Sequence, residues 1–556
     1  MNKGLEFSDY VVFLIYFFVV AVYGYWIYNR KKKVHADSKD FFLAEGSLTW
    51  WAIGASLIAS NISAEQFIGM SGDGFAMGLA IATYEWLAAA TLIGIAIFFL
   101  PIYLKNKIYT MPQFLRQRYS PQVANIMAVF WLSLYIVVNL TSILFLGALA
   151  ISTISGFNFT FCMMFLAVFA IAITLGGMKV IGYTDVIQVF FLILGGVATT
   201  YLALDLVGQQ IHTPGIFGGL TALTQQASDH FVMVFSKDSP HFMSMPGLSV
   251  IMGGMLIVHL NYWGCNQYIT QRALGADLKT ARSGLLFASY LKLLMPIIVV
   301  LPGIAAYVLW KNGGLQTEML KDGELVKDNA YPVLLNLLPH GLKGLSFAAL
   351  TAAVVASLAG KANSISTIFT LDIYKNSMNK SASEKTLVWV GRLAVVGAMI
   401  LALLLAPFLG IDKKGGFEFI QEYTGFVSPG IFAMFILGFF WKRATAKAAM
   451  FAIVGGFLLS VFFKVIPPYV DLSFLNSSGF AVVSATSGLY EIPFLDRMAF
   501  VFVLVVVAMI AISYSDSKVS TSTIEVDPTM FRTSKGFAVG ALVVMIALVV
   551  LYAKYW

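Results

Sequence analysis

Apolar stretches of about twenty residues recur along the whole chain and alternate with shorter polar segments. A helix of about twenty apolar residues crosses the roughly 30 Å hydrocarbon core of a bilayer. We therefore expect an all-α polytopic membrane protein with about fourteen transmembrane helices. The predicted spans lie near residues 8–29, 48–71, 78–103, 122–152, 157–176, 183–206, 247–270, 284–309, 344–373, 387–409, 416–440, 446–464, 495–514 and 535–553.

Composition and charge agree with this prediction. The chain is 59% apolar and 12% charged, and a soluble protein carries about twice that charged fraction. Lys and Arg are about twice as frequent in one set of alternate loops as in the other, which predicts that both termini lie outside. Two outer loops, near 207–246 and 310–343, are long and polar, and we expect short helices in them that cover the outer mouth. The net charge of +8 resides in the loops and does not indicate nucleic acid as a partner.

Two of the predicted spans are interrupted by polar residues. The 48–71 span contains the run Ser60 to Gln66, and the 247–270 span contains the run His259 to Gln267. They lie about five spans apart, where an inverted five-helix repeat places its two broken helices. No soluble domain or long linker separates the spans, so we expect a single transmembrane domain over residues 1–556.

Polar side chains inside hydrocarbon are costly, so each is a candidate for function. Their mixture of donors and acceptors suits the hydroxyls of a sugar. Structural roles stay open: Glu65 and Glu85 can pair with other helices, His259 can be a satisfied polar residue, and the nearby Tyr and Trp residues can be packing. The predicted intramembrane set is Glu65, Gln66, Glu85, Asp185, His259, Lys292, Lys361, Gln421 and Glu422.

A sodium ion needs several oxygen ligands, and a broken helix offers carbonyls for this purpose. Ala59 lies just before the first interruption and Ile62 lies within it, and Ser357 and Ser364 share one face of the 344–373 helix. Serines in membrane helices also often bond to their own backbone. The sequence contains no phosphate loop, no HExxH and no nucleophile elbow, so we expect a transport protein that is not an enzyme.

Several long strings of residues are typical of one family. They are 55–70 (ASLIASNISAEQFIGM), 84–86 (YEW), 183–191 (YTDVIQVFF), 420–425 (IQEYTG) and a stretch from Asn363 to Lys375. Through these strings the chain closely resembles the bacterial sodium/galactose carriers of the sodium/solute symporter family, essentially from end to end.

The resemblance implies a LeuT-like fold, alternating access and coupling to sodium. It implies two inverted five-helix repeats, near 48–206 and 247–440, with peripheral helices near 8–29, 446–464, 495–514 and 535–553. By position, the sugar ligands would be Gln66, Glu85, Lys292 and Gln421, with Asn61 nearby. Met70 and Phe417 would close the outer side, and Tyr262 would stack on the sugar and close the inner side. The sodium ligands would be the carbonyls of Ala59, Ile62 and Ala353 and the hydroxyl of Ser357, with Asp185 on the sodium path.

Three departures from the resemblance bear on solute and ion. His259 stands where the galactose carriers have an asparagine ligand, and Ala88 where they have a serine, so the sugar can differ from galactose. Ala356 stands where the family usually has a second sodium-site serine. Positions 359–361 read Ala-Gly-Lys, where many relatives carry hydroxyls and then an apolar residue. Lys361 follows Ser357 by four residues and projects from the same helix face.

These departures lead to a hypothesis about the coupling ion. Lys361 would occupy the space of the missing hydroxyls and neutralise Asp185, which would weaken sodium coupling or replace it with proton coupling or none. The alternative is that Lys361 extends to the cytoplasmic end of its helix.

We therefore expect a multi-pass inner-membrane transporter that imports a neutral hexose-type sugar by sodium symport with alternating access. Its partners would be the small sugar and the lipid bilayer, and no obligate protein partner is evident. Alternatives are a proton-coupled or uncoupled sugar carrier, a membrane sugar sensor, and a carrier of another solute such as sialic acid or inositol.

Overall fold

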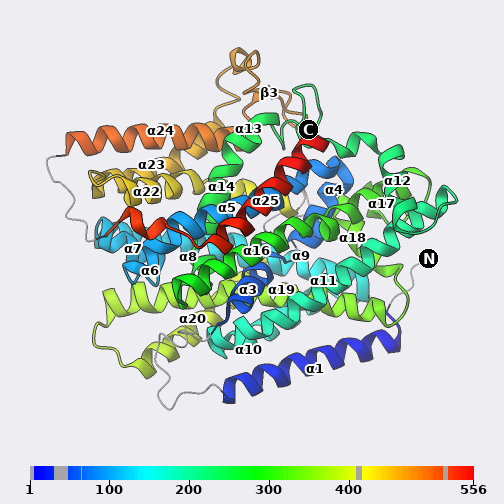
Figure 1. The fold of residues 1–556 in the computed structure, drawn as a ribbon, viewed down its shortest axis with the longest axis horizontal. Coiled ribbons are helices and arrows are strands. Elements are labelled where there is room, and N and C mark those ends of the chain that lie inside the picture. The colour runs from blue at the N-terminus through cyan, green and yellow to red at the C-terminus, as the bar shows by residue number, and fades with distance from the viewer. Residues whose placement is uncertain (1–4, 31–47, 64, 322, 409–415, 517–523) are drawn as a thin grey trace.

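The computed structural model describes residues 5–30, 48–63, 65–321, 323–408, 416–516 and 524–556, and these residues are almost entirely helical (Figure 1). Ala64, in the first predicted interruption, lies outside the described residues. The side chain of Glu65, predicted to lie in the membrane, is also outside them.

Helices coincide with each predicted apolar stretch. Within the described ranges, ten helices are long and apolar enough to cross a membrane, or eleven if one bent pair counts as a span. Two shorter apolar helices, α10 and α22, fall in further predicted spans. The main helices of the predicted spans are α1 (Phe7–Arg30), α8 (Pro121–Ser133) continued through η4 (Leu134–Leu140) into α9 (Thr141–Ser155), α10 (Phe159–Thr174), α11 (Gly177–Gln210), α16 (Leu278–Val299), α17 (Leu301–Lys311), α19 (Leu342–Thr367) with η7 (Ile368–Met378), α20 (Glu384–Leu405) with η8 (Ala406–Phe408), α22 (Ser428–Phe440), α23 (Ala446–Val465), α24 (Phe494–Ser515) and α25 (Lys535–Tyr555).

Shorter elements carry the breaks and the loops. The broken regions contain α3 (Trp50–Asn61), η1 (Glu65–Met70), α4 (Ser71–Met77), α13 (Gly247–Met252), α14 (Gly254–Gly264), α15 (Gln267–Leu274) and α21 (Gly416–Gly425). The span after α4 runs through η2 (Gly78–Ala82), α5 (Thr83–Gly94), η3 (Ile95–Phe99) and α6 (Leu100–Lys105), and α7 (Met111–Arg118) follows. Both predicted outer loops contain short helices: α12 (Ile216–Gln226) and η5 (Ser228–Phe231) in one, η6 (Lys327–Asn329) and α18 (Ala330–Asn336) in the other. Further short helical turns are η10 (Ser473–Leu475) and η11 (Pro528–Phe531).

Two small antiparallel hairpins are the strands found in the described part of the chain. β1 (Leu320–Lys321) pairs with β2 (Glu324–Leu325), with Leu320 opposite Leu325. β3 (Val482–Val483) pairs with β4 (Tyr490–Glu491), with Val482 opposite Glu491.

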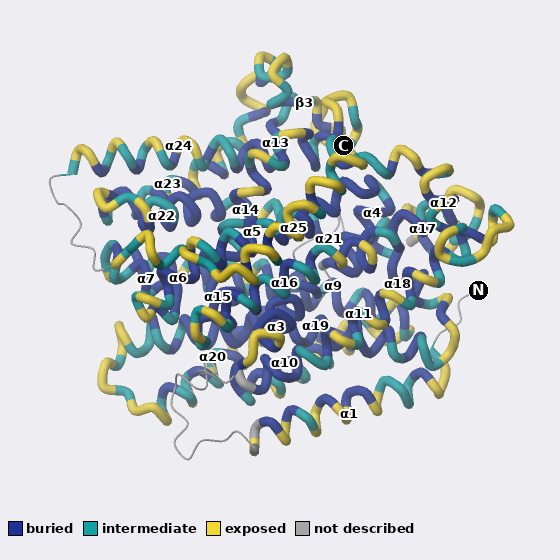
Figure 2. The backbone as a smooth tube through the Cα atoms, in the orientation of Figure 1, coloured by how far each residue is buried: buried dark blue, intermediate teal, exposed yellow. Residues whose placement is uncertain are grey.

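The peripheral helices expose apolar side chains. Phe18 of α1, Val507 of α24 and Val549 of α25 are 70%, 59% and 65% exposed. Exposed positions gather along α1 and α24 at opposite edges of the molecule (Figure 2). A soluble protein would not leave such faces uncovered, so lipid is the solvent for them and the chain is a multi-pass membrane protein.

The interior depends on close helix packing around α19, nearly all of which is buried. A Cβ atom added to Gly147 of α9 would lie 2.6 Å from a methyl group of Val354 of α19. Small residues let membrane helices approach closely and gain van der Waals contact. This packing holds α9 against α19.

Candidate functional site

A cavity lined mainly by buried residues lies between segments that are far apart in the sequence. The structure brings ten of the predicted site residues to its wall: Asn61, Gln66, Met70, Glu85, His259, Tyr262, Lys292, Lys361, Phe417 and Gln421. Ala88, the position noted as a departure, lines it as well.

The first helix break lies inside the predicted polar run. α3 ends at Asn61, and Ile62 takes up extended backbone angles, with φ −86° and ψ 106°. The backbone amide of Ser63 donates a hydrogen bond to Oε1 of Gln66 at 3.0 Å, which satisfies one group released by the break. The two N–H donors of the Gln66 amide are not used in this bond.

The cavity contains a buried ion pair. Lys292 of α16 donates from Nζ to Oε2 of Glu85 of α5 at 2.5 Å, and also to Oδ1 of Asn61. The two charged residues are only 1% and 2% exposed. Pro296, four residues later, has no N–H to bond the Lys292 carbonyl, which disrupts α16 at this level. A sugar hydroxyl can donate to the carboxylate and accept from the ammonium.

His259 of α14 presents an unsatisfied nitrogen at the cavity. The residue is 5% exposed, and its Nε2 has no hydrogen-bond partner among the described residues. The alternative of a satisfied core histidine therefore does not describe it. A buried polar atom without a partner is unfavourable, so a ligand hydroxyl at this nitrogen would remove a cost.

Tyrosine hydroxyls link the two broken helices on one side of the cavity. α14 and α15 form a pair bent by 47° at Cys265 and Asn266. Asn61 donates from Nδ2 to the hydroxyl of Tyr262 at 3.1 Å, and that hydroxyl lies 2.5 Å from the hydroxyl of Tyr268. Tyr268 in turn donates to the Ser60 carbonyl at 2.5 Å. A linked series of this kind holds the ends of α3 and α14 in register.

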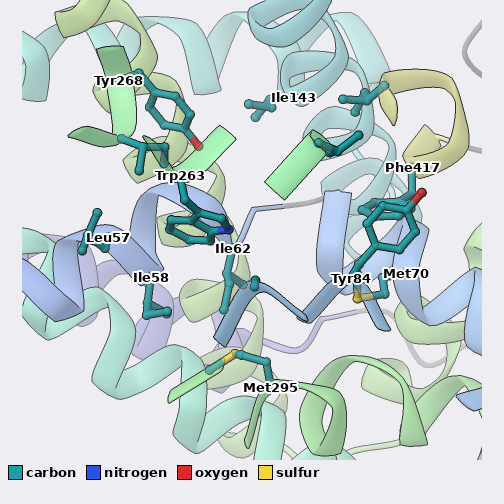
Figure 3. Packing of buried hydrophobic residues seen from close by; sticks show 14 of the residues in the cluster. Leu57, Ile58, Ile62, Met70, Tyr84, Ile143, Trp263, Tyr268, Met295 and Phe417 are labelled. Atoms are coloured by element: carbon teal, nitrogen blue, oxygen red, sulfur yellow. The ribbon is translucent and has the colours of Figure 1, made fainter. Parts of the chain in front are cut away.

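Apolar side chains cover the other side of the cavity. Met70 is fully buried and Phe417 is 2% exposed. The ring of Tyr84 packs edge-on against Phe417, with centroids 4.8 Å apart. These three side chains gather together in Figure 3, away from Tyr268. A Cβ atom on Gly69 would lie 2.7 Å from the Cβ of Phe417, so glycine lets η1 and α21 touch.

Of the residues predicted to bind sodium, Ala59 and Ile62 lie at the first break and Ser357 contacts it. Ala59, Ile62, Ala353 and Ser357 are all buried. Ser357 of α19 donates from Oγ to the Ser60 carbonyl at 3.0 Å, which brings a hydroxyl of α19 to the last turn of α3. Ser364 instead bonds to the Gly360 carbonyl of its own helix at 3.1 Å, the alternative anticipated for membrane serines.

The predicted pairing of Lys361 with Asp185 is wrong in this structure. The cation beside Asp185 is Arg272 of α15, with Nη2 and Oδ2 separated by 4.0 Å. Ser56 also donates to that oxygen at 2.6 Å. Arg272 reaches this position because Gly360 leaves room: a Cβ atom there would lie 2.4 Å from Nη2. Lys361 instead places Nζ 5.0 Å from the centre of the Tyr268 ring, and its 2% exposure excludes extension to the surface.

One residue of the predicted intramembrane set has a structural contact away from the cavity. Glu422 accepts from Lys464 at 2.7 Å and from Arg497 at 3.0 Å. These residues belong to α23 and α24, so Glu422 ties α21 to the peripheral helices.

Sequence reasoning gave no site role to several residues at the cavity wall. Asn139, Asn266 and Thr424 contribute polar groups, and Trp263 lies with its ring centre 5.3 Å from Nζ of Lys292. Asn139 had a usable signal, because it is an amide near the middle of the apolar 122–152 span.

Comparisons with known proteins agree with this architecture. The sodium/glucose cotransporter of Vibrio parahaemolyticus is 44% identical, over 100% of this chain and 99% of its own length. The sodium/myo-inositol cotransporter 2 of Homo sapiens is 34% identical, over 83% of this chain and 70% of its own. Among solved structures, a Na⁺-coupled sialic acid symporter in a substrate-bound outward-open state superposes with a TM-score of 0.76. It shares 22% identity, covers 93% of this chain and 99% of its own, and so shows the fold alone.

A family model gives the assignment directly. The model of the sodium:solute symporter family matches residues 41–456, most of the length of the chain. On this match and the full-length relative, the chain belongs to the sodium:solute symporter family.

Proposed function

We propose that the chain is a secondary active transporter of the bacterial inner membrane that imports a neutral hexose-type sugar by sodium symport with alternating access. One observation carries this proposal: Gln66, Glu85, Lys292 and Gln421, from four separate helices, line one buried cavity. Relatives named as glucose and myo-inositol cotransporters support it, since both names denote neutral, hydroxyl-rich solutes.

The sugar would lie against hydrogen-bonding groups at its edge and an aromatic ring at its face. Its hydroxyls would bond to Gln66, Glu85, Asn61, His259, Lys292 and Gln421. Tyr262 would stack on the sugar and close the inner side, and Met70 and Phe417 would close the outer side. The Lys292–Glu85 pair supports this assignment because it already holds a strong donor and a strong acceptor at the cavity.

Sodium would bind as the co-substrate between the first break and α19. Its ligands would be the carbonyls of Ala59, Ile62 and Ala353 and the hydroxyl of Ser357. The contact of Ser357 with the last turn of α3 supports this position. An ion there would fix the helix break that also positions Asn61, so ion and sugar would each favour the same conformation.

The finer architecture is part of the same proposal. About fourteen spans would form two inverted five-helix repeats near 48–206 and 247–440, surrounded by the four peripheral helices. The broken pairs α3–η1 and α14–α15, at corresponding places in the two halves, support this arrangement.

A specific observation supports a second candidate function, that of a carrier with weak or different ion coupling. Ala356 removes one hydroxyl from the expected sodium site, and the ammonium of Lys361 lies over Tyr268, which bonds to the same Ser60 carbonyl as Ser357. A cation so placed would repel sodium. A proton-coupled carrier, an uncoupled carrier or a sugar sensor would each be compatible with it.

Uptake into proteoliposomes tests both candidates. Radiolabelled glucose, galactose and myo-inositol are offered with an inward sodium gradient, with an inward proton gradient and with no gradient. The proposal predicts that sodium drives one of these solutes above its outside concentration. Accumulation driven by protons alone would favour the second candidate, and binding without uptake would favour a sensor.

A further inference from the structure

A short outer element lies directly beside the residues that cover the cavity. Lys327 of η6 places Nζ 2.6 Å from Oδ1 of Asp73 and 3.1 Å from Oε1 of Glu418. Asp73 lies three residues after Met70, and Glu418 directly follows Phe417. One ammonium therefore bridges α4, which begins directly after Met70, and α21, which carries Phe417.

The bridge is partly shielded from water. Asp73 is 1% exposed, and its second oxygen, Oδ2, has no hydrogen-bond partner within the described ranges. The side chains of Lys327 and Glu418 are 25% and 29% exposed. The backbone of η6 is also in contact with α4, because a Cβ atom on Gly72 would lie 3.0 Å from the Lys327 carbonyl. The buried carboxylate thus depends on Lys327 for compensation of its charge.

The electrostatics keep this lysine charged. Burial lowers the pKa of Lys327, but the carboxylates of Asp73 and Glu418 outweigh that effect and raise the pKa overall. Opening the cover means moving Phe417 away from η1. The Lys327 ammonium cannot follow both carboxylates in that movement, so one of its two ion pairs has to break.

We infer that Lys327 is a positioning residue of the outer gate, which locks α4 to α21 through Asp73 and Glu418 while the gate is closed. The inference rests on the proposed role of Met70 and Phe417 as that gate. The lock biases the equilibrium between the closed and open gate, and it contacts neither sugar nor sodium.

The test measures gate opening by chemical labelling. A Met70→Cys reporter is placed in a chain carrying Cys162→Ala and Cys265→Ala, so that the two native thiols do not react. A membrane-impermeant maleimide is added from outside to spheroplasts that express the chain. Because the Met70 position is fully buried here, labelling reports how often the outer gate opens.

Removing the ammonium is expected to accelerate labelling. Lys327→Met should raise the rate about tenfold, which corresponds to about 1.4 kcal/mol in the gate equilibrium. Lys327→Arg keeps the charge and should stay within about twofold of the parent. The matched control is Lys311→Met. It also removes a charge from the outer region, but the Lys311 side chain bonds to the Gln226 carbonyl and not to the cover. Labelling of this control should stay near the parental rate.

A second variant decides the question if Lys327→Met does not fold. Glu418→Gln leaves the pair with buried Asp73 intact and weakens only the bridge to α21, so it should also accelerate labelling. Parental labelling rates in Lys327→Met or in Glu418→Gln would overturn the inference, as would equal acceleration in Lys311→Met. Labelling needs neither sugar nor sodium. Its result therefore tests the Lys327 lock even if the sugar-uptake assay fails.

Discussion

Removal of the Glu85 charge tests the buried ion pair and the sugar site together. Glu85→Gln leaves the Lys292 ammonium, 1% exposed, without its counter-charge. Breaking one partner of a buried pair costs about 3 to 5 kcal/mol. The cost cannot exceed the free energy of neutralising the lysine by deprotonation. A lysine that titrates near pH 10.4 in water needs about 4.6 kcal/mol to lose its proton at pH 7, which agrees with this range. The amide oxygen of the glutamine and Oδ1 of Asn61 still accept from Nζ, which favours the lower end of the range.

Sugar affinity should fall in the same variant. A hydrogen bond to a charged group contributes about 1.5 to 3 kcal/mol, so its loss predicts a dissociation constant raised roughly 10- to 150-fold. Isothermal titration of the purified protein measures affinity, and thermal unfolding in detergent measures stability. Both quantities should change in Glu85→Gln.

A double variant separates the two effects. Glu85→Gln with Lys292→Met removes both charges, and replacing a buried pair by neutral side chains is often nearly neutral for stability. The thermal midpoint should therefore return most of the way to the parental value, while sugar affinity stays low. A double variant that regains sugar affinity, or a Glu85→Gln protein with parental affinity and stability, would contradict the role of Glu85 in the sugar site.

Three further changes address the ion site and the inner side. Ser357→Ala should raise the sodium concentration for half-maximal uptake about tenfold, because one oxygen ligand is lost; an unchanged sodium titration would contradict the assigned site. Lys361→Met should lower that concentration, since it removes a resident positive charge, and equal sodium dependence in both proteins would argue against the repulsion. Tyr262→Phe removes the bonds to Asn61 and Tyr268 but keeps the stacking ring. Sugar KM should then change less than about threefold while counterflow efflux accelerates, and unaltered efflux would count against an inner gate here.

The order of the helices and the places of both breaks follow from the hydrophobic pattern, because membrane length and the cost of polar groups in lipid act locally. The convergence of Gln66, Glu85, Lys292 and Gln421 could be expected only from the family resemblance, since no local pattern encodes distances between helices. The number of spans could not be fixed by length alone, because helices such as α10 and α22 are short.

The partner of Asp185 shows where sequence reasoning fails. Lys361 has suitable spacing on its own helix, but the choice of cation depends on tertiary packing. Arg272 lies just after the second broken span, where a basic residue is normally interpreted as a loop charge that sets topology. The structure instead buries it to 1% exposure against Gly360. Lys327 is similar, since a lysine in a polar outer loop carries no signal of its contact with Asp73.

The convergence of the four polar side chains on a bound sugar is tested most directly by an electron cryo-microscopy structure of the protein in nanodiscs with saturating hexose and sodium. We expect density for one sugar ring in the cavity, with its hydroxyls within hydrogen-bond distance of Gln66, Glu85, Lys292 and Gln421. Sugar density elsewhere, or a cavity without sugar under conditions in which binding is measured, would contradict it.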